Sequence, residues 1–255
     1  MPYDAPVPPR SEIVHLDEHL LVINKPPGLS LATKPSEPGA AAERVRASLG
    51  ARDKSRVAGE LHLVHRLDVG TSGLVALARD AETHRGLVTA LGEKRIEKLY
   101  LALVWGRPKP GRGTWEEPLG PDRKDRRRMR VDPAGRPSVS EYAIRETGHG
   151  VSLLELTPRT GRTHQLRVHA AHVGHPVVGD DLYGGPRHHG VRLRELRAAL
   201  GPPHTLLHAW RLTLPAPPLA APLALEAPLP PAFAHALAVC GWTLEPAGPA
   251  PAGIR

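Results

Sequence analysis

The chain has 255 residues, 34 Lys and Arg against 26 Asp and Glu, a formal net charge of +8 and a sequence pI near 10.0. One compact domain fits this length, and the charge favours a polyanionic partner, although an Arg-rich surface that only solubilises the protein fits the charge equally well. The single cysteine, Cys240, excludes a disulfide framework and a cysteine-rich zinc module, which predicts a reducing, cytoplasmic location.

The first residues carry no export signal. Met1 to Arg10 lack a basic start and an apolar stretch, and no later apolar run approaches the roughly 20 residues that cross a bilayer, so we expect no membrane association.

From Glu12 to Asn24, two apolar runs flank Asp17-Glu18-His19, a pattern that predicts two short strands around a turn. Lys25-Pro26-Pro27-Gly28 should end the second strand.

The next part of the chain alternates helical and strand patterns. The expected elements are a helix over 40–49, a polar loop through 60, a short apolar segment over 61–64, a buried strand over 74–78, a helix over 81–91 and a strand over 98–105. Asp80 is a suitable N-cap for the helix over 81–91, because its carboxylate can accept hydrogen bonds from free N–H groups of the first turn.

A basic segment rich in Gly and Pro follows over 107–137 and is predicted to be a long loop or hairpin. Its centre is the run Arg123-Lys124-Asp125-Arg126-Arg127-Arg128-Met129-Arg130. Beyond it we expect strands over 139–145, 151–158 and 205–214, and helices over 164–173, 191–200 and 231–239. Strands with interspersed helices and no regular βαβ alternation predict an α+β domain with a largely antiparallel mixed sheet flanked by helices and loops.

The domain boundaries follow from these patterns. We expect an N-terminal extension over 1–11, one catalytic domain over 12–244, and a tail over 245–255 that is disordered because it is rich in Pro, Ala and Gly.

The densest motif is His65-Arg66-Leu67-Asp68-Val69-Gly70-Thr71-Ser72-Gly73. It places a carboxylate in a turn rich in Gly and hydroxyl residues directly before a buried strand, and loops held by a rigid sheet are where reactive groups tend to lie. From these residues alone, the alternative is a structural turn in which the Asp68 side chain accepts hydrogen bonds from the N–H groups of Gly70 and Thr71.

A second motif runs from Pro158 to His169 and places a Gly turn ahead of Arg167. If Arg167 meets Asp68, the guanidinium keeps the carboxylate ionised and aimed. A phosphate-binding or merely solvated basic loop is the alternative from spacing alone.

Together these segments resemble the RluA-type RNA pseudouridine synthases, part of the RsuA/RluA-like group. His65-Arg66-Leu67-Asp68 with Thr71-Ser72-Gly73 is similar to the family signature, and Lys25-Pro26-Pro27-Gly28, Lys98-Leu99-Tyr100 and Thr160 to His169 are similar to three further family elements in the same order. His175-Pro176, Gly179-Asp180, Tyr183-Gly184 and Leu207-His208-Ala209 also fall in family order. The resemblance covers about residues 12 to 240, and four ordered motifs of this length are not expected by chance.

The resemblance implies a stand-alone catalytic domain that converts specific uridines of structured RNA, 23S rRNA or tRNA or both, to pseudouridine without metal or organic cofactor. It implies that Asp68 is the essential carboxylate for breaking the N-glycosidic bond, as a nucleophile or on a glycal route. Tyr100 matches the active-site tyrosine, with plain core packing as the alternative, and Arg167 matches the arginine that pairs with the aspartate. We expect His65, Thr71, Lys98, His164 and Gln165 to support the site.

RNA contacts are expected at two kinds of position. Arg66 is similar to the family arginine that enters the space vacated by the flipped nucleotide, with a simple phosphate contact as the alternative. Phosphate contacts are also expected from Arg162 and from the basic run, namely Arg123, Lys124, Arg126, Arg127, Arg128 and Arg130, unless that run is a solvated hairpin.

Family members often carry an N-terminal S4 RNA-binding domain, but here the resemblance begins near residue 12, so we expect none. We also expect a monomer, which is the default for an enzyme that grips a large RNA. The segment from Lys34 to Glu60 is then a further candidate for recognising the RNA.

A metal site and two other functions fit the sequence less well. The histidines at 164, 169, 172 and 175, with Asp180, have spacings that do not put the four imidazoles on one helical face, so hydrogen-bonding roles are favoured over a metal site. An RNA-binding protein without catalysis explains the charge but not the ordered Asp, Tyr and Arg motifs. A metal-dependent RNA hydrolase needs a clear ligand set and loses activity in EDTA.

Overall fold

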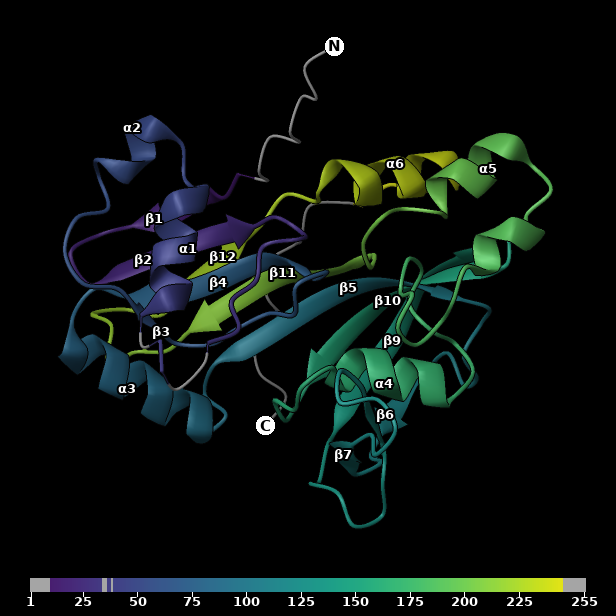
Figure 1. The fold of residues 1–255 in the computed structure, drawn as a ribbon, viewed down its shortest axis with the longest axis horizontal. Coiled ribbons are helices and arrows are strands. Elements are labelled where there is room, and N and C mark those ends of the chain that lie inside the picture. The colour runs from purple at the N-terminus through teal and green to yellow at the C-terminus, as the bar shows by residue number, and fades with distance from the viewer. Residues whose placement is uncertain (1–9, 34–35, 38, 245–255) are drawn as a thin grey trace.

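The computed structural model describes residues 10–33, 36–37 and 39–244 (Figure 1). The predicted tail, most of the predicted N-terminal extension, and Lys34 lie outside the described residues. The main sheet has ten strands: β1 (Glu12–Leu16), β2 (Leu20–Lys25), β3 (His62–Leu63), β4 (Ser72–Ala78), β5 (Glu97–Trp105), β6 (Arg112–Trp115), β9 (Ser140–Gly148), β10 (Val151–Pro158), β11 (Leu207–Leu214) and β12 (Leu223–Glu226).

The strands lie in the order β1-β2-β4-β11-β5-β10-β9-β6, with β3 paired to β4 and β12 paired to β11. The β4–β11 pair is parallel, and the other described strand pairs are antiparallel. The predicted α+β fold with a largely antiparallel mixed sheet is therefore confirmed.

The helices are α1 (Ala40–Ser48), α2 (Ala51–Lys54), α3 (Ala81–Gly92), α4 (Gln165–His172), α5 (Arg194–Ala199) and α6 (Pro231–Val239), with a 3-10 turn η1 (Arg187–Gly190). Asp80 caps α3 as predicted, since its Oδ1 accepts a hydrogen bond from the Thr83 N–H at 2.8 Å. None of the described helices is long and apolar enough to cross a bilayer.

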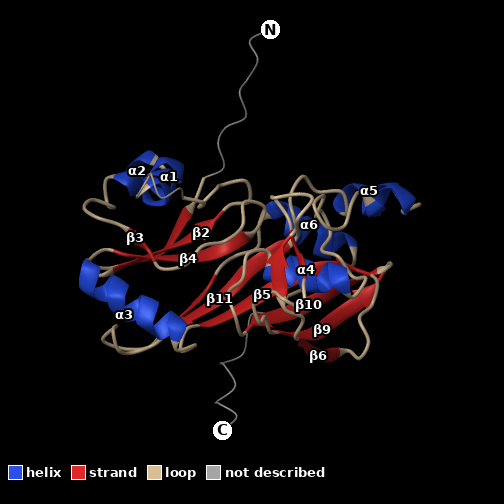
Figure 2. Ribbon diagram, turned by 60° about the horizontal axis from the view of Figure 1, so that its bottom comes forward, coloured by secondary structure: helices blue, strands red, loops and turns tan. Residues whose placement is uncertain are grey.

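Side chains alternate between the two faces of the sheet because successive residues of a strand point to opposite sides. On β5, Tyr100, Ala102 and Val104 belong to the hydrophobic cluster that also contains residues of α1 and α4, whereas Leu101 and Leu103 pack in the cluster that contains residues of α5 and α6. Figure 2 shows α1 and α3 on opposite sides of strands β2 and β4. Tyr100 and α4 therefore share one face of the sheet.

The pairing of β4, β11 and β5 places residues from three sequence motifs side by side in the sheet. Gly73 at the start of β4 pairs with Ala209 of β11, and Ala209 pairs with Tyr100 of β5. Gly73 has φ 111°, and a Cβ built on it would lie 2.3 Å from the Ala209 carbonyl oxygen, so no other residue fits without a backbone shift. The glycine that ends the Asp68 motif thus sets how closely the loop before β4 approaches the centre of the sheet.

Outside residues 107–137, two local predictions were wrong, and one strand was missed. The polar loop expected through residue 60 contains the short helix α2, because one helical turn needs little apolar periodicity. The helix expected over 191–200 begins only at Arg194, after the 3-10 turn η1. Strand β12 was not anticipated, since its four residues stand among prolines and find their partner only in β11.

A second, two-stranded sheet stands apart from the main one. Strands β7 (Leu119–Pro121) and β8 (Met129–Val131) pair antiparallel, and the segment 122–128 joins them. We call residues 119–131 the basic hairpin. The prediction of a loop or hairpin over 107–137 is confirmed for these residues, but it was wrong for Arg112–Trp115, which form β6 and pair with β9 at the edge of the main sheet.

His208 on β11 predicts a pH dependence of stability. It is 0% exposed, its Nδ1 lies 2.9 Å from the Ser72 hydroxyl, and its Nε2 lies 3.3 Å from the Ala227 carbonyl oxygen. Burial lowers its pKa from 6.5 to about 4, against the weaker opposing effect of the Ala227 carbonyl. Between these two pH values the unfolded state binds the extra proton, so the free energy of unfolding rises with pH.

We therefore expect His208→Gln to reduce the slope of the unfolding free energy against pH between about pH 4 and pH 6.5. The reduction should be about 1.4 kcal/mol per pH unit, which corresponds to one bound proton. The stability that neutral His208 contributes is fully present above about pH 6.5 and is lost as the pH falls through about 4. Urea denaturation at several pH values measures this. The exposed histidine variant His149→Asn should keep the native slope, and equal slopes for the two variants would contradict the assignment.

Candidate active site

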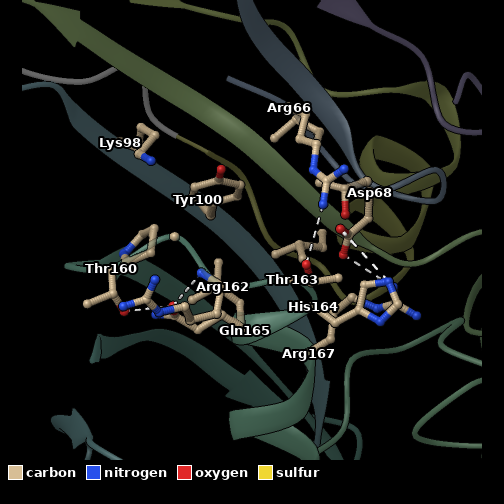
Figure 3. Close-up of a pocket in the computed structure, with 16 residues that line it drawn as sticks. Arg66, Asp68, Lys98, Tyr100, Thr160, Arg162, Thr163, His164, Gln165 and Arg167 are labelled. Carbon is tan, nitrogen blue, oxygen red and sulfur yellow. Dashed lines mark hydrogen bonds and ion pairs between the residues drawn. The ribbon is translucent and has the colours of Figure 1, made fainter. Parts of the chain in front are cut away.

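A small pocket of about 130 Å³ opens between the loop before β4, strand β5 and the loop before α4 (Figure 3). Its lining includes residues from three of the sequence motifs, among them Asp68, Tyr100 and Arg167. Pockets that hold drug-sized ligands usually measure about 300–1,000 Å³, so this one suits a single small group.

Arg167 on α4 joins two carboxylates. Its Nη1 donates to Asp68 Oδ2 at 3.2 Å, while its Nε and Nη2 donate to the two oxygens of Asp180 at 2.7 and 2.9 Å. The exposed fraction of the side chain is 24% for Asp68, 10% for Arg167 and 0% for Asp180. Asp68 and Arg167 both line the pocket, with Asp68 the more exposed of the two, and the buried Asp180 holds the guanidinium on the side away from the pocket.

Arg167 remains charged although its side chain is largely buried. Burial opposes the charged form, but the hydrogen bonds to Asp180 and the charges of Asp180 and Asp68 outweigh it and raise the pKa of Arg167 above its usual value. A permanently charged, planar guanidinium is suited to orienting two carboxylates at once.

His164 lies on the other side of Asp68. It precedes α4 in the left-handed region with φ 56°, and its Nε2 lies 4.0 Å from Asp68 Oδ1. Its Nδ1 is 2.8 Å from the Tyr183 hydroxyl oxygen. Burial lowers the pKa of His164, with Asp68 raising it and Arg167 lowering it further, so the neutral imidazole is favoured near pH 7.

Tyr100 and Lys98 form the opposite wall of the pocket (Figure 3). Burial and the Asp68 charge raise the pKa of Tyr100, so its phenol stays protonated. Its hydroxyl makes no hydrogen bond with another described residue. Burial lowers the pKa of Lys98, which faces the same pocket.

The Lys-Pro-Pro-Gly motif fixes the loop that carries Asp68. Lys25 is 0% exposed, and its Nζ donates to the carbonyl oxygens of Pro26, Leu29 and Val69 at 2.9, 3.0 and 3.3 Å. The Gly28 N–H donates to the same Val69 oxygen at 2.7 Å. Burial lowers the pKa of Lys25 to about 7, against the opposing charge of Asp68. The N-terminal motif thus acts on the residue next to Asp68.

Two residues of the signature motif have structural contacts. His65 Nε2 accepts a hydrogen bond from the Ala76 N–H at 3.3 Å, and burial, followed by the Lys98 charge, lowers the pKa of His65 to about 3. The Thr71 N–H donates to the backbone oxygen of Asp68 at 3.1 Å. No hydrogen bond of the Asp68 carboxylate to the N–H of Gly70 or Thr71 occurs, so the carboxylate is not committed to a structural turn. The Thr71 hydroxyl is buried without a partner among the described residues.

The loop before α4 is organised by Gln165. Its Oε1 accepts from the Thr160 hydroxyl at 2.7 Å and from the Arg162 N–H at 3.0 Å, and its Nε2 donates to Val139 O and Ser140 Oγ, both at 2.9 Å. Arg66 is exposed and reaches across the pocket mouth, where its Nη2 lies 3.4 Å from the Thr163 hydroxyl (Figure 3).

The cations of the basic hairpin fall into two groups. Arg127 pairs with Asp125 at 2.8 Å, Arg130 pairs with Asp132 at 2.6 Å, and the Arg128 guanidinium lies 5.3 Å from the centre of the Tyr183 ring. Arg123, Lys124 and Arg126 are exposed and have no ion pair with a described residue. Arg162 is half-buried, and its Nε donates to Pro137 O at 3.2 Å.

The histidines near α4 are spread over separate contacts. His169 is 0% exposed and bonds Ser140 Oγ and Glu117 O, each at 2.9 Å, and His175 Nδ1 lies 2.9 Å from Trp105 O. Within the described ranges no group of three or more His, Cys, Asp or Glu side chains has the geometry of a metal site.

The sequence prediction missed two residues of this site. Asp180 stands in a family segment and in a possible metal set of the sequence, and Tyr183 in a family segment, but neither was assigned a role in the site. In the structure Asp180 fixes Arg167 and Tyr183 contacts His164. The Gly179-Asp180 pair was a usable signal. Gly179 has φ 75°, and a Cβ there would lie 2.3 Å from His204 O, so this turn is sterically specified.

This chain is similar to known proteins over most of its length. A family model described as RNA pseudouridylate synthase matches residues 19–172, more than half of the chain. An uncharacterized RNA pseudouridine synthase of Chloroflexus aurantiacus is 43% identical over 199 residues, which are 76% of this chain and 62% of that protein. The dual-specificity RNA pseudouridine synthase RluA of Escherichia coli (strain K12) is 35% identical over 228 residues, which are 89% of this chain and 96% of that protein.

The chain spans less than two thirds of some relatives, including 58% of YhcT, an uncharacterized RNA pseudouridine synthase of Bacillus subtilis (strain 168) that is 37% identical over 176 residues. Among solved structures, human RNA pseudouridylate synthase domain containing 4 superposes with a TM-score of 0.68 at 29% identity, covering 89% of this chain and 91% of that one. By family match, by identity to RluA and by fold, this chain belongs to the RNA pseudouridylate synthase family.

Proposed function

We propose that this chain is an RNA pseudouridine synthase that isomerises specific uridines in structured RNA. The observation that carries the proposal is the Asp68 carboxylate, which faces a small pocket and is held by Arg167 at 3.2 Å, with Tyr100 on the opposite wall. Membership of the family supports the same conclusion.

The reaction needs few groups. The bond between N1 of uracil and C1′ of ribose breaks, the base turns, and a bond forms between C5 and C1′, while C5 loses a proton and N1 gains one. The change is redox neutral and leaves every heavy atom in the nucleotide, so its chemistry calls for neither metal nor organic cofactor. As a nucleophile or on a glycal route, Asp68 must be ionised, and the fixed charge of Arg167 favours that form.

The state of Tyr100 limits its part in the reaction. Because burial and the Asp68 charge raise its pKa, the phenol is a proton donor near neutral pH rather than a base. We propose that its ring packs on the uracil and that its hydroxyl, which has no partner among the described residues, serves the ribose.

Substrate entry requires base flipping. A uridine stacked in RNA does not reach a carboxylate in a pocket of about 130 Å³, so the nucleotide must be extruded at a cost of a few kcal/mol. The exposed Arg66 lies at the pocket mouth and is placed to fill the vacated space. Candidate targets are 23S rRNA and tRNA, and the dual-specificity name of the relative RluA supports keeping both. A cytoplasmic location and a monomeric state stay predictions.

The basic hairpin is proposed to grip the RNA backbone. We expect the triple variant Arg123→Gln, Lys124→Gln, Arg126→Gln to weaken RNA binding and to lower the slope of log Kd against log salt by about 2 to 3, because each phosphate contact releases about 0.7 to 0.9 counterion. Filter binding at several salt concentrations measures both quantities.

The matched control removes the same charge elsewhere. Arg192, Arg194 and Arg197 are exposed at or next to α5, which packs on the sheet face opposite α4. Their triple Gln variant should leave the slope within about 1 of the native value. Equal effects of the two triple variants would show that net charge alone matters, and would contradict the proposal that the basic hairpin contacts the RNA backbone.

Two other functions have distinct outcomes. A metal-dependent RNA hydrolase loses activity in EDTA and shortens the RNA, whereas the proposed isomerase is indifferent to EDTA and keeps the chain length. An RNA-binding protein without catalysis binds the same RNA but leaves no pseudouridine.

The test of the proposed function is pseudouridine mapping on total RNA from a strain that lacks this gene. We expect specific sites to disappear and to return when the native gene is restored. If no site changes, the proposed activity is wrong in the cell, and RNA binding without catalysis becomes the leading account.

A further inference from the structure

Tyr183 lies between the basic hairpin and the catalytic pocket. Its hydroxyl oxygen accepts a hydrogen bond from the N–H of Met129 on β8 at 2.8 Å and lies 2.8 Å from His164 Nδ1. Its ring centre lies 5.3 Å from the guanidinium carbon of Arg128 and 5.1 Å from that of Arg167. One side chain thus contacts two hairpin residues and two residues beside Asp68.

The hydrogen bonds around Tyr183 select a tautomer of His164. A phenol has one hydrogen to donate, and the Met129 N–H can only donate, so the phenol hydrogen must go elsewhere. His164 Nδ1 is the acceptor within reach. We therefore assign the hydrogen of the neutral imidazole to Nε2, the atom that lies 4.0 Å from Asp68 Oδ1.

The opposite tautomer satisfies fewer groups. With its hydrogen on Nδ1, His164 would donate to Tyr183, and the phenol hydrogen would lack an acceptor among the described residues. The lone pair of Nε2 would then face the Asp68 carboxylate, which is repulsive. With its hydrogen on Nε2, the imidazole turns a donor toward the carboxylate. The 4.0 Å contact is longer than a hydrogen bond, and such catalytic contacts commonly tighten when substrate binds.

The hairpin needs contacts of this kind. It is a two-stranded sheet with no strand pairing to the main sheet, and an isolated two-stranded hairpin is at best marginally stable. Its base is held by backbone bonds such as Asp132 N–H to Pro118 O at 2.9 Å, whereas Tyr183 holds strand β8 close to α4.

We propose that Tyr183 is a positioning residue that couples the basic hairpin to the catalytic centre. The relay runs from the Met129 N–H to the Tyr183 hydroxyl, then to His164 Nδ1, and from His164 Nε2–H to Asp68. RNA that engages the hairpin thereby favours the arrangement in which Asp68 is aimed at the pocket. The inference rests on the proposed function, because it assigns a role to the same site.

The first test separates binding from chemistry. Tyr183→Phe keeps the ring against Arg128 and Arg167 and removes only the hydroxyl. We expect its single-turnover rate at saturating enzyme to fall about 10-fold to 100-fold, since small misplacements of catalytic groups have effects of this size, while Kd stays within about twofold. Transcripts of 23S rRNA fragments and of tRNA serve as substrates.

A matched variant controls for the loss of a tyrosine hydroxyl. Tyr142 is buried on β9, and its hydroxyl donates to Pro110 O at 2.9 Å, away from the pocket. Tyr142→Phe should leave both rate and Kd within about twofold of native. If Tyr183→Phe matches it, or changes Kd alone, Tyr183 is only a packing or hairpin contact and the coupling is refuted.

The second test measures which ring nitrogen of His164 carries the hydrogen. Nitrogen NMR of the histidine rings in the free protein should show His164 with its hydrogen on Nε2, a signal identified by its loss in His164→Gln. Tyr183→Phe should convert it to a mixture of tautomers. In the His164→Gln background the added Tyr183→Phe change should slow the reaction less than about twofold, because coupled residues are not additive.

These outcomes keep the two proposals apart. If the native protein makes no pseudouridine in any transcript, the proposed function fails, while the NMR measurement still decides the relay. If the native protein is active but His164 carries its hydrogen on Nδ1, or is the same tautomer in Tyr183→Phe, the relay is wrong and the proposed function stands.

Discussion

Asp68→Asn is expected to lower the single-turnover rate of pseudouridine formation by on the order of 10⁴-fold or more, the size of effect seen when a central catalytic group is lost. Asparagine keeps the shape of the side chain but has no negative charge to act at the nucleoside. The RNA affinity should stay within about twofold, because the exposed cations of the basic hairpin, which we propose contact the RNA, are unchanged. Quenched reactions with a labelled transcript measure the rate, and filter binding measures Kd.

The control for Asp68→Asn is Asp181→Asn. Asp181 is exposed beside Asp180 and has no ion pair or hydrogen bond with a described residue, so the substitution makes the same charge change outside the pocket. Its rate should match the native rate. A substantial residual rate in Asp68→Asn would assign the chemistry to another group, and a large loss in RNA binding would make Asp68 a recognition residue.

Asp180→Asn is expected to destabilise the fold by about 3 kcal/mol, since breaking a buried ion pair by removing one partner commonly costs 3–5 kcal/mol. Asp180 is 0% exposed and takes two hydrogen bonds from Arg167. Its Oδ1 also accepts from the N–H groups of Leu182 and Tyr183 at 3.1 and 3.2 Å, and the Asn oxygen can keep those. The loss therefore falls on the bond to Arg167. Urea denaturation followed by tryptophan fluorescence measures it.

Glu141→Gln is the matched control for Asp180→Asn. The Glu141–Arg159 pair has a similar separation of 2.8 Å, but its side chains are 43% and 50% exposed, so its loss should cost less than about 1 kcal/mol. Asp180→Asn should also slow the reaction, because Arg167 loses the ion pair with Asp180 that holds it in place, whereas Glu141→Gln should not. A cost for Asp180→Asn as small as that of the control would mean that Arg167 is held by other contacts.

Two carboxylates that share one guanidinium have different roles here because of exposure. Asp180 takes the two shorter bonds and is sealed from solvent, whereas Asp68 takes one bond of 3.2 Å and keeps 24% of its side chain exposed to the pocket. The buried carboxylate fixes the arginine, and the arginine in turn orients the carboxylate that we propose meets the substrate.

Local structure was largely predictable where one segment contains its own signals. The cap of α3 at Asp80 needs only its first turn, and α6 (Pro231–Val239) matches the range expected from the sequence. Strand β12 and helix α2 were not predictable, because the first depends on its partner β11 and the second on a single turn.

The pairing of Arg167 with Asp68 was an expectation that the contact at 3.2 Å now supports, but its origin is tertiary. The two residues are 99 positions apart, and only the register of β4, β11 and β5 brings the loop before β4 next to α4. The same is true of the cations in the basic run: charge was visible in the sequence, whereas the pairing of Arg127 and Arg130 with Asp125 and Asp132 was not.

Motifs, caps and hydrophobic periodicity are local properties of the chain, so the residue types of the proposed site, their order and the α+β class could be predicted from the sequence. Tertiary structure alone decided which groups meet: the support of Arg167 by Asp180, the fixing of the Asp68 loop by Lys25, and the place of Tyr183 between hairpin and pocket. Those contacts depend on distances between segments far apart in the chain, which strand register and packing set and which no local pattern encodes.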